Sequence, residues 1–456
     1  MELPDLLNEK MIQRVEGCNR SDLTGYLEKK LGSLRVIPEK TEGIEVFEET
    51  ILSGEKKYTL CNPRNTNYIN LNENSFYLWS LINGKRSVGG LFSEVVDRYG
   101  AADIRGIRET LVMLSRGGFF KSGLVSLDEL VIEHFEKNTY KHRLKKGFGW
   151  LVHGRFELRK LDRFFKWASR FIFRPFYTPV GFTVSALFAL TGLVLFFYFF
   201  HITKESLFIV SEVSQNIPFS VIDTIIIYLI FFLSMLIHES AHGAAVKHYG
   251  RRVISAGFLI YYGLPIFFVD TTDILMKDRG VRIKVSFAGP FANGVLAGVL
   301  ILAASLMKPG LAREILLTSG ILNAILFIFN LLPIAETDGH YIVEDFTRIP
   351  GIRGKAFNFL RHGFVRKLGN RTPWSREDKI VLVYGLISVA GTLYLIYFAV
   401  ELWWNILYRL VVDAFKNPEL LAPILGVIGA LFLIQLARYT LWRIKLHRGR
   451  LNHLAV

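Results

Sequence analysis

The stretch IIIYLIFFLSMLIHESAHGAAV, residues 225–246, sets three ionisable side chains into an otherwise apolar run. A helix needs about 20 apolar residues to cross the hydrocarbon core of a bilayer, so this stretch is long enough to span it. His238, Glu239 and His242 are costly at that depth, and such side chains mark functional sites in membrane helices. The stretch therefore predicts a membrane-spanning helix that carries chemistry.

The spacing of the two histidines indicates which chemistry. Residues four positions apart lie on one face of a helix, so the imidazoles of His238 and His242 can reach one metal ion. Zn²⁺ binds histidine nitrogens, and a catalytic zinc site keeps one coordination position open for water. Glu239 could take the proton of that water and pass it to a leaving amine. Because the pattern also arises by chance, an exposed and idle histidine pair at a helix end is the alternative.

A catalytic zinc ion needs a third protein ligand, and the segment NLLPIAETDG, residues 330–339, offers one. Pro333 should break the preceding helix, and Gly339 should permit a turn. Asp338 can then be brought back toward the histidines. We expect Asp338 to complete the metal site.

Five further stretches are long, apolar and poor in charge. With the first, they predict six membrane-spanning helices, centred on residues 180–200, 225–246, 285–307, 315–335, 380–400 and 420–437. A shorter apolar run at residues 253–269 is rich in β-branched and aromatic residues and is interrupted by Gly257, Gly263 and Pro265. We predict a strand or re-entrant hairpin there, with a seventh span as the alternative. The edge of such a hairpin could hold a substrate extended near Glu239.

Composition favours a membrane protein over a soluble one. The chain has 456 residues, of which 51% are hydrophobic and 21% charged, and its net charge is +15. Residues 1–150 carry 22 basic and 21 acidic side chains, a balance of +1, whereas residues 151–456 carry 33 and 19, a balance of +14. The excess thus lies in the apolar half, which is typical of basic cytoplasmic loops. The two cysteines exclude a disulfide-stapled scaffold.

The basic residues also predict an orientation. With six spans and the N-terminus inside, the outer loops hold five of the 33 basic residues that follow residue 150. We therefore expect an integral protein of a bacterial cytoplasmic membrane with both termini in the cytoplasm. This orientation places the histidine pair and Asp338 at a similar depth.

The first 145 residues form a separate, nearly neutral region. Residues 58–60 and 68–71 predict two short strands around an Asn-Pro-Arg-Asn turn. Three helices are expected to follow, over residues 76–82, 88–99 and 104–115, with Asn72 as the N-cap of the first. This order is typical of a small α+β, winged-helix-like domain.

The stretch YINLNENSFYLWSLINGKRSVGGLFSEVVDRYG, residues 68–100, resembles the PqqD-like family of leader-peptide recognition domains. The resemblance extends over about residues 58–120. It implies that a leader peptide is added as a strand to the sheet edge and against a helix. A winged helix that binds DNA is the alternative, but the near-zero charge of the region disfavours it, so we expect no nucleic-acid partner.

The pair of motifs HExxH and NxxPxxxxDG resembles the site-2 protease family of membrane-embedded zinc metalloproteases. The segments GLPIFFVDTTD and VRIKVSFAGPFANG, residues 263–273 and 281–294, are similar to the members that are fused to PqqD-like domains. The resemblance implies a three-helix catalytic core over about residues 221–341. It also implies the roles of four residues: His238, His242 and Asp338 as zinc ligands and Glu239 as the general base.

Other polar residues near the motifs have weaker cases. The family pattern favours the aspartate of NxxPxxxxDG over its neighbours Glu336 and His340. Asn293, in the third span, lies where the family often has an asparagine that could contact the substrate or the oxyanion, and a helix-packing amide is the alternative. Asp270 and Asp273 follow the hairpin and are expected to be structural or to gate the substrate.

The expected fold class is mostly α: a polytopic membrane protein with a site-2 protease-like core, plus the small α+β domain. The expected organisation is an N-terminal extension (1–50), the PqqD-like domain (51–125), a basic amphipathic connector (126–178), the six-helix protease domain (179–441, core 221–341) and a basic cytoplasmic tail (442–456).

Together these features predict a membrane-embedded zinc endopeptidase. Its expected substrate is a ribosomally synthesised, post-translationally modified peptide, whose leader the N-terminal domain would capture. Zn²⁺ is the expected cofactor, and peptide-modifying enzymes and the lipid bilayer are further expected partners. The alternatives are regulated cleavage of a membrane-anchored signalling protein, a non-catalytic peptide-binding or transport protein, and a membrane-tethered transcription regulator. Short outer loops disfavour the first, and a base at Glu239 disfavours the second.

Overall fold

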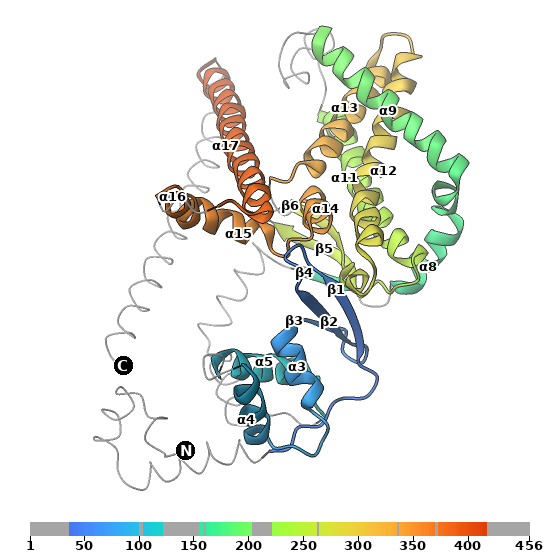
Figure 1. Cartoon of the computed structure of the whole chain (residues 1–456). Helices are drawn as coiled ribbons and strands as arrows, with labels where there is room; N and C mark the ends of the chain where they lie inside the picture. Colours follow the sequence, from blue (N-terminus) through green and yellow to red (C-terminus); the bar gives the residue numbers. More distant parts are fainter. Residues whose placement is uncertain are drawn as a thin grey trace. The chain divides into compact units, whose positions relative to one another are not determined.

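The computed structural model describes residues 36–99, 104–121, 155–158, 161–202, 221–261, 264–334, 337–369 and 373–416 (Figure 1). The chain divides into two compact units, Met1–Gly385 and Leu386–Val456. The first unit contains every element discussed below except the later part of the last helix.

A three-stranded antiparallel sheet and three helices form the N-terminal domain. The strands are β1 (Glu45–Thr50), β2 (Lys56–Asn62) and β3 (Asn67–Asn72), in this spatial order, and the helices are α3 (Glu73–Leu81), α4 (Val88–Tyr99) and α5 (Ile104–Arg116). Asn72 caps α3 as predicted, since its side chain accepts a hydrogen bond from the Ser75 N–H at 2.9 Å. The order of β2, β3 and the three helices is confirmed, whereas β1 is missing from the sequence prediction.

The two faces of this sheet differ because side chains alternate along each strand. Apolar side chains of β2 and β3 point toward the helices and form the core of the domain: Tyr58, Leu60, Ile69 and Leu71. The opposite face carries polar side chains in rows across the three strands. Two of these rows are Glu45–Cys61–Tyr68 and Glu49–Lys57–Asn72.

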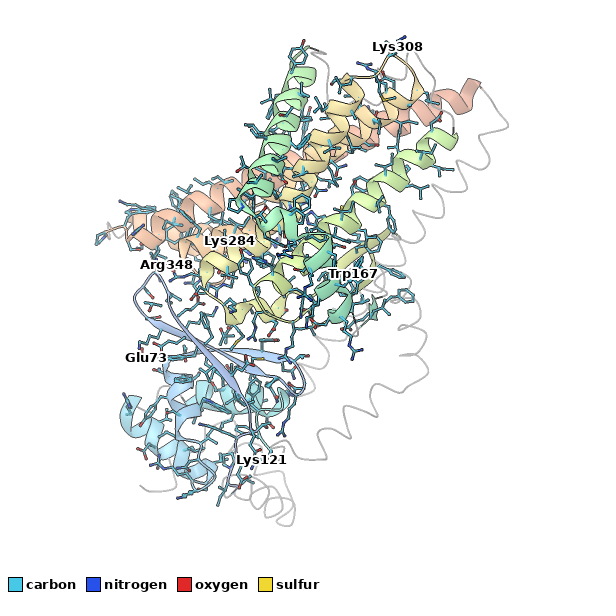
Figure 2. All side chains as sticks on the ribbon, turned by 90° about the vertical axis from the view of Figure 1, so that its right-hand side faces the viewer. Glu73, Lys121, Trp167, Lys284, Lys308 and Arg348 are labelled. Atoms are coloured by element: carbon cyan, nitrogen blue, oxygen red, sulfur yellow. The ribbon has the colours of Figure 1, made fainter. Side chains whose placement is uncertain are left out.

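Four helices are long and apolar enough to cross a membrane: α9 (Pro179–Ile202), α11 (Val221–His248), α12 (Arg279–Ser305) and α13 (Leu311–Leu331). They coincide with the first four predicted spans and indicate an integral membrane protein. Helix α12 contacts the other three. Lys308 lies at one end of the bundle, and Lys284 and Arg348 lie toward the other (Figure 2). The predicted topology requires this separation, and the direction in which the bundle crosses the membrane stays a prediction.

The contact between α9 and α12 depends on glycine. A Cβ atom at Gly298 would lie 1.8 Å from the carbonyl oxygen of Phe188, and one at Gly192 would lie 2.4 Å from the Gly298 nitrogen. Small residues of this kind allow helix backbones to approach closely in membranes.

The apolar run at residues 253–269 forms the predicted hairpin and not a seventh span. Its strands are β5 (Ala256–Tyr261) and β6 (Leu264–Val269), and β4 (Arg155–Leu158) pairs with the other side of β5. Within the described chain, β6 is therefore an edge of a three-stranded sheet with the order β4-β5-β6. It packs beside α11, where the rings of Phe267 and Phe232 lie 4.5 Å apart.

Short helices connect and follow the bundle. The 3-10 helix η4 (Thr272–Met276) leads from β6 to α12, and α14 (Asp338–Thr347) follows α13. Beyond them lie α15 (Ile352–Asn358), a π-helical turn (Phe359–Gly363) and α16 (Phe364–Gly369). Helix α17 (Arg376–Lys416) covers the predicted fifth span but is not among the four membrane candidates of the described residues.

Several predictions fall outside the described residues: the sixth span at 420–437, the tail, residues 1–35 and most of the connector. The described part of the connector includes α8 (Asp162–Phe171), which leaves Phe164, Trp167 and Phe171 exposed. Lys247 of α11 holds this helix through Asp162, with its Nζ 2.8 Å from Oδ1.

Candidate metal centre

Helix α11 and the first residue of α14 bring three predicted ligand residues together. The Nε2 atoms of His238 and His242 lie 3.2 Å apart. Asp338 places Oδ2 3.2 Å from Nε2 of His238 and Oδ1 3.2 Å from Nε2 of His242. In a tetrahedral zinc site with bonds of about 2.0–2.1 Å, ligand atoms lie about 3.3 Å apart. The spacing of these atoms therefore fits a zinc ion.

The other nitrogen of each imidazole has its own partner. Nδ1 of His238 lies 2.5 Å from Oδ1 of Asn293, and Nδ1 of His242 lies 2.7 Å from the carbonyl oxygen of Val285. Both partners are acceptors, so each Nδ1 carries the proton and each Nε2 keeps a free lone pair. Metal-ligating histidines are oriented in this way by outer hydrogen bonds. The donor set thus has the tautomer that a metal requires.

Asn293 belongs to a chain of buried polar groups that crosses three helices. Its Nδ2 donates to Oδ1 of Asn323 on α13 at 3.0 Å. Asn323 in turn donates from its Nδ2 to Oγ of Ser234 on α11 at 3.0 Å. Buried polar groups are costly unless they are hydrogen-bonded, and here each amide has partners on both sides. Asn323 and Ser234 are not among the residues predicted from the sequence, although a polar residue within an apolar span is a signal of this kind.

Gly289 of α12 faces the same histidine nitrogens. A Cβ atom at this position would lie 2.2 Å from Nε2 of His242 and 2.6 Å from Nε2 of His238. Any side chain would therefore enter the space between the ligand atoms. The glycine leaves that space open for an ion.

The side chain of Glu239 extends from α11 to the hairpin. Its Oε2 accepts a hydrogen bond of 2.9 Å from the backbone N–H of Val269, the last residue of β6. This hydrogen bond fixes the position of the carboxylate relative to β6. The structure thus puts the predicted base directly beside the edge strand.

Two other predicted candidates are engaged elsewhere. His340 is buried, and its Nδ1 lies 2.8 Å from the hydroxyl of Tyr384. Asp270 closes a local turn, since its Oδ1 accepts from the N–H of Thr272 at 3.0 Å and from its hydroxyl at 2.6 Å. Glu336 lies outside the described residues. Among the described residues, the one group of His, Cys, Asp or Glu able to share a metal is His238, His242 and Asp338.

Asp273 is fully buried and serves a structural contact. Its Oδ1 accepts from the hydroxyl of Tyr68 at 2.5 Å and from Nη2 of Arg251 at 2.6 Å, and its Oδ2 accepts from the N–H of Arg252 at 2.7 Å. Burial alone would raise the pKa of the Asp273 carboxyl, but the hydrogen bonds from Arg251, Tyr68 and Arg252 hold it below its usual range.

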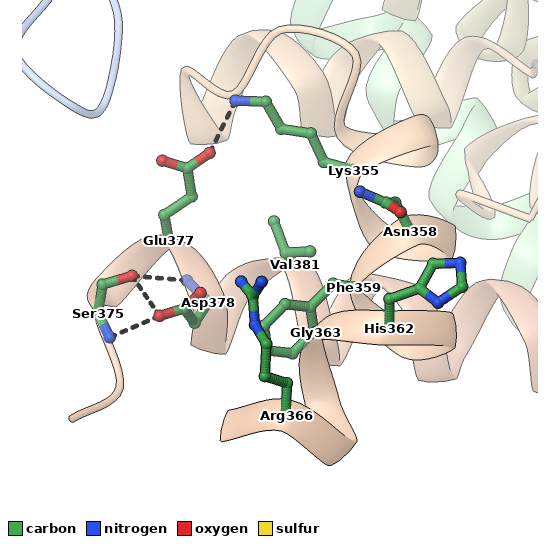
Figure 3. Close-up of a pocket in the computed structure, with 10 residues that line it drawn as sticks. All are labelled: Lys355, Asn358, Phe359, His362, Gly363, Arg366, Ser375, Glu377, Asp378 and Val381. Atoms are coloured by element: carbon green, nitrogen blue, oxygen red, sulfur yellow. Dashed lines mark hydrogen bonds and ion pairs between the residues drawn. The ribbon is translucent and has the colours of Figure 1, made fainter. Parts of the chain in front are cut away.

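A cavity lies apart from these residues, between α15, α16 and the start of α17 (Figure 3). Its acidic residues are paired: Glu377 with Nζ of Lys355 at 2.7 Å, and Asp378 with the N–H of Ser375 at 2.8 Å and with Lys367. This cavity is therefore separate from the histidine and aspartate group that could share a metal ion.

Comparison with known proteins agrees with both parts of this description. The family described as "Coenzyme PQQ synthesis protein D (PqqD)" matches residues 57–116. The chain therefore contains a PqqD domain, as its sequence predicts.

Part of the chain is similar to proteins named as zinc metalloproteases. YydH of Bacillus subtilis, provisionally named a peptide zinc metalloprotease, is 30% identical over 123 residues, which are 27% of this chain and 48% of that protein. YwhC of the same organism, also provisionally named a zinc metalloprotease, is 27% identical over 214 residues, 37% of this chain and 94% of YwhC. The zinc metalloprotease MJ0392 of Methanocaldococcus jannaschii is 26% identical over 201 residues, 43% of this chain and 54% of MJ0392.

These similarities show distant homology to peptide zinc metalloproteases. The match spans about half the length of YydH and of MJ0392 and nearly all of YwhC. No solved structure matches the chain.

Proposed function

We propose that the chain is a membrane-embedded zinc endopeptidase that cleaves a ribosomally synthesised, post-translationally modified peptide. The observation that carries this proposal is the triangle of His238, His242 and Asp338, with Glu239 beside it. The homology to zinc metalloproteases supports the reaction. The PqqD domain supports a peptide substrate with a leader segment.

In this proposal, Nε2 of His238, Nε2 of His242 and the carboxylate of Asp338 would hold a zinc ion. A bound zinc ion supplies Lewis acidity, which polarises a peptide carbonyl and makes water a stronger nucleophile. Glu239 takes the proton of the attacking water at Oε1, since its Oε2 is held by the N–H of Val269. The same oxygen then gives the proton to the leaving amine.

Asn293 orients His238 in this proposal. Its Oδ1 and Nδ2 atoms are both engaged, with His238 and with Asn323. These contacts favour the positioning role over contact with the substrate or the oxyanion.

The edge of β6 holds the substrate in extended form. The N–H of Asp270 donates to Ser255 beside β5, whereas the N–H of the preceding Val269 points away from β5 to Glu239. Backbone groups alternate along a strand, so the N–H and C=O of Phe267 also point away from β5. A peptide paired with Phe267 would lie next to Glu239. Pro265 fits the same alternation, because it lacks an N–H where β5 needs none.

The orientation is part of the proposal. We place both termini and the metal centre on the cytoplasmic side of a bacterial membrane, where the PqqD domain can meet newly made peptides. Peptide-modifying enzymes would act on the same precursor before cleavage.

Co-expression tests this function. The protein is produced with short peptides encoded near its gene, and the products are compared by mass spectrometry between the wild type and Glu239→Gln. We expect a truncated peptide with the wild type and an intact precursor with the variant, whereas Glu48→Gln, an exposed control, should cleave normally. A product that persists with Glu239→Gln would overturn the catalytic assignment.

A further inference from the structure

Two arginines join the polar face of the N-terminal sheet to the membrane part. Nη2 of Arg251 lies 3.0 Å from Oε2 of Glu45 on β1 and 2.6 Å from Oδ1 of Asp273. Nη2 of Arg282 lies 2.7 Å from Oε2 of Glu49 on β1.

Arg282 also pairs within the membrane part, where its Nη2 lies 2.6 Å from Oδ1 of Asp345 on α14. Each arginine thus binds one acid of β1 and one acid of the membrane part.

The Arg282–Glu49 pair and Asp273 are shielded from solvent, whereas the side chain of Glu45 is 43% exposed. The side chains of Arg282 and Glu49 are 7% and 9% exposed, and that of Asp273 is fully buried. Removing one partner of a buried ion pair leaves an unpaired charge, which is strongly destabilising. The hydroxyl of Tyr68 on β3 reaches the same Asp273. The contact therefore extends from β1 to β3, across the polar face of the sheet.

The membrane partners of this sheet each lie a short way along the chain from the candidate metal centre. Arg251 follows the end of α11 by three residues, and Asp273 follows Val269 of β6 by four. Arg282 precedes Gly289 on α12 by seven residues, and Asp345 follows Asp338 on α14 by seven. Seven helical residues rise about 10 Å. Four elements that build the metal centre and hold Glu239, namely α11, β6, α12 and α14, thus each lie close in sequence to a residue of the contact with the PqqD domain. Helix α13, which contributes Asn323, is the exception.

We propose that Arg251 and Arg282 are positioning residues that fix the PqqD domain on the membrane part, so that the bond to be cut is selected by its distance from the captured leader. This inference rests on the proposed function. The polar face is covered by the docking contact, so a leader strand must use a sheet edge. The edge of β3 lies beside α3 and offers both a strand and a helix.

The docked distance sets a lower limit on the spacing. Along the axis of α12, Arg282 lies about 10 Å from Gly289 at the metal centre, and in this proposal the peptide between the leader and the cut bond bridges at least this distance. An extended chain covers about 3.3 Å per residue, so at least about three residues separate the leader from the bond. An enzyme of this kind selects the bond by its distance from the leader more than by the sequence around the bond.

Hydrogen–deuterium exchange on the full chain in detergent tests the docking. Glu49→Arg should speed exchange in residues 45–50 and 278–283 by at least about tenfold, because a buried pair is broken. Glu49→Gln keeps a hydrogen-bond acceptor for Arg282 and adds no like charge beside Lys57, so it should speed exchange less than Glu49→Arg does. Glu48→Arg is the matched control, since Glu48 on the same strand pairs with Lys56 in solvent, and it should change neither segment. Unchanged exchange with Glu49→Arg would overturn the docking.

A lengthened substrate tests the distance rule. A precursor peptide found to depend on Glu239 is made with a Gly-Ser insertion between its leader and its cut bond. We expect the wild type to cut at an unchanged number of residues from the leader, which is two residues before the original bond. Glu49→Arg should cut at several bonds. A cut that stays at the original bond would overturn the distance rule and leave the endopeptidase assignment standing. Absence of any Glu239-dependent product would instead refute the proposed function.

Discussion

Replacing Asn293 by alanine should weaken zinc binding, whereas replacing its partner Asn323 should cost stability but little zinc affinity. The substitution removes the acceptor of His238 Nδ1, at 2.5 Å, and the donor to Asn323 Oδ1, at 3.0 Å. Without the first contact, the imidazole can turn or change tautomer, so that Nε2 no longer faces the metal. Loss of an outer hydrogen bond of this kind costs about 10- to 100-fold in metal affinity, or about 1.4–2.7 kcal/mol.

The assay is a titration of the purified protein with zinc against a chelator of known affinity. Asn323→Ala is the matched control, because it breaks the same polar chain one step further from the metal. It should lower zinc affinity by less than about threefold while costing comparable stability, on the order of 1–3 kcal/mol for a buried group left unpaired.

Normal zinc affinity in Asn293→Ala would refute this reasoning. If zinc still bound normally while peptide cleavage became slow, Asn293 would instead contact the substrate or the oxyanion. That contact is the one that the family resemblance implies for Asn293, beside the alternative of a helix-packing amide.

Three further predictions test other contacts. Gly289→Ala should abolish zinc binding in the same titration, because its Cβ would lie 2.2 Å from an imidazole nitrogen, whereas Gly280→Ala on the same helix meets nothing within 4 Å and should bind normally. Because the pKa of folded Asp273 is lowered, its carboxylate contributes fully to stability above the unfolded pKa of about 3.9, and this contribution is lost as the pH falls further. The thermal unfolding temperature of the wild type should therefore fall below about pH 4, and that of Asp273→Asn should vary less with pH. Phe267→Pro should reduce peptide cleavage at least about tenfold while zinc affinity stays unchanged, and equal loss of both would contradict an edge-strand role.

Local patterns in the sequence predicted that His238, His242 and Asp338 lie close together, and the structure groups these three residues. The i, i+4 spacing fixes two imidazoles on one helix face, and a proline and a glycine around Asp338 signal the break that returns the carboxylate. The hairpin was predicted for a related reason, since Gly and Pro interrupt a β-branched run. Each of these signals lies within a few residues of the feature that it predicts.

Long-range contacts between polar residues could not be predicted in this way. Arg282 and Glu49 are separated by 233 positions, and either one alone resembles an ordinary surface charge. Strand β1 was not predicted, because its sequence EVFEET is rich in charge and resembles a solvent-exposed loop. Only the contact with the membrane part shows why Glu45 and Glu49 lie on one face of a strand. Asn323 and Ser234 needed a third helix in place before their pairing had any meaning.

The polar chain from His238 through Asn293 and Asn323 to Ser234 has a mechanical consequence. Lipid tails are as apolar as the helices, so hydrophobic burial does little to fix the rotation of one membrane helix against another. Turning or sliding any one of α11, α12 and α13 by a residue would break hydrogen bonds on both of its neighbours at once. These hydrogen bonds therefore fix the rotation of the three helices relative to one another.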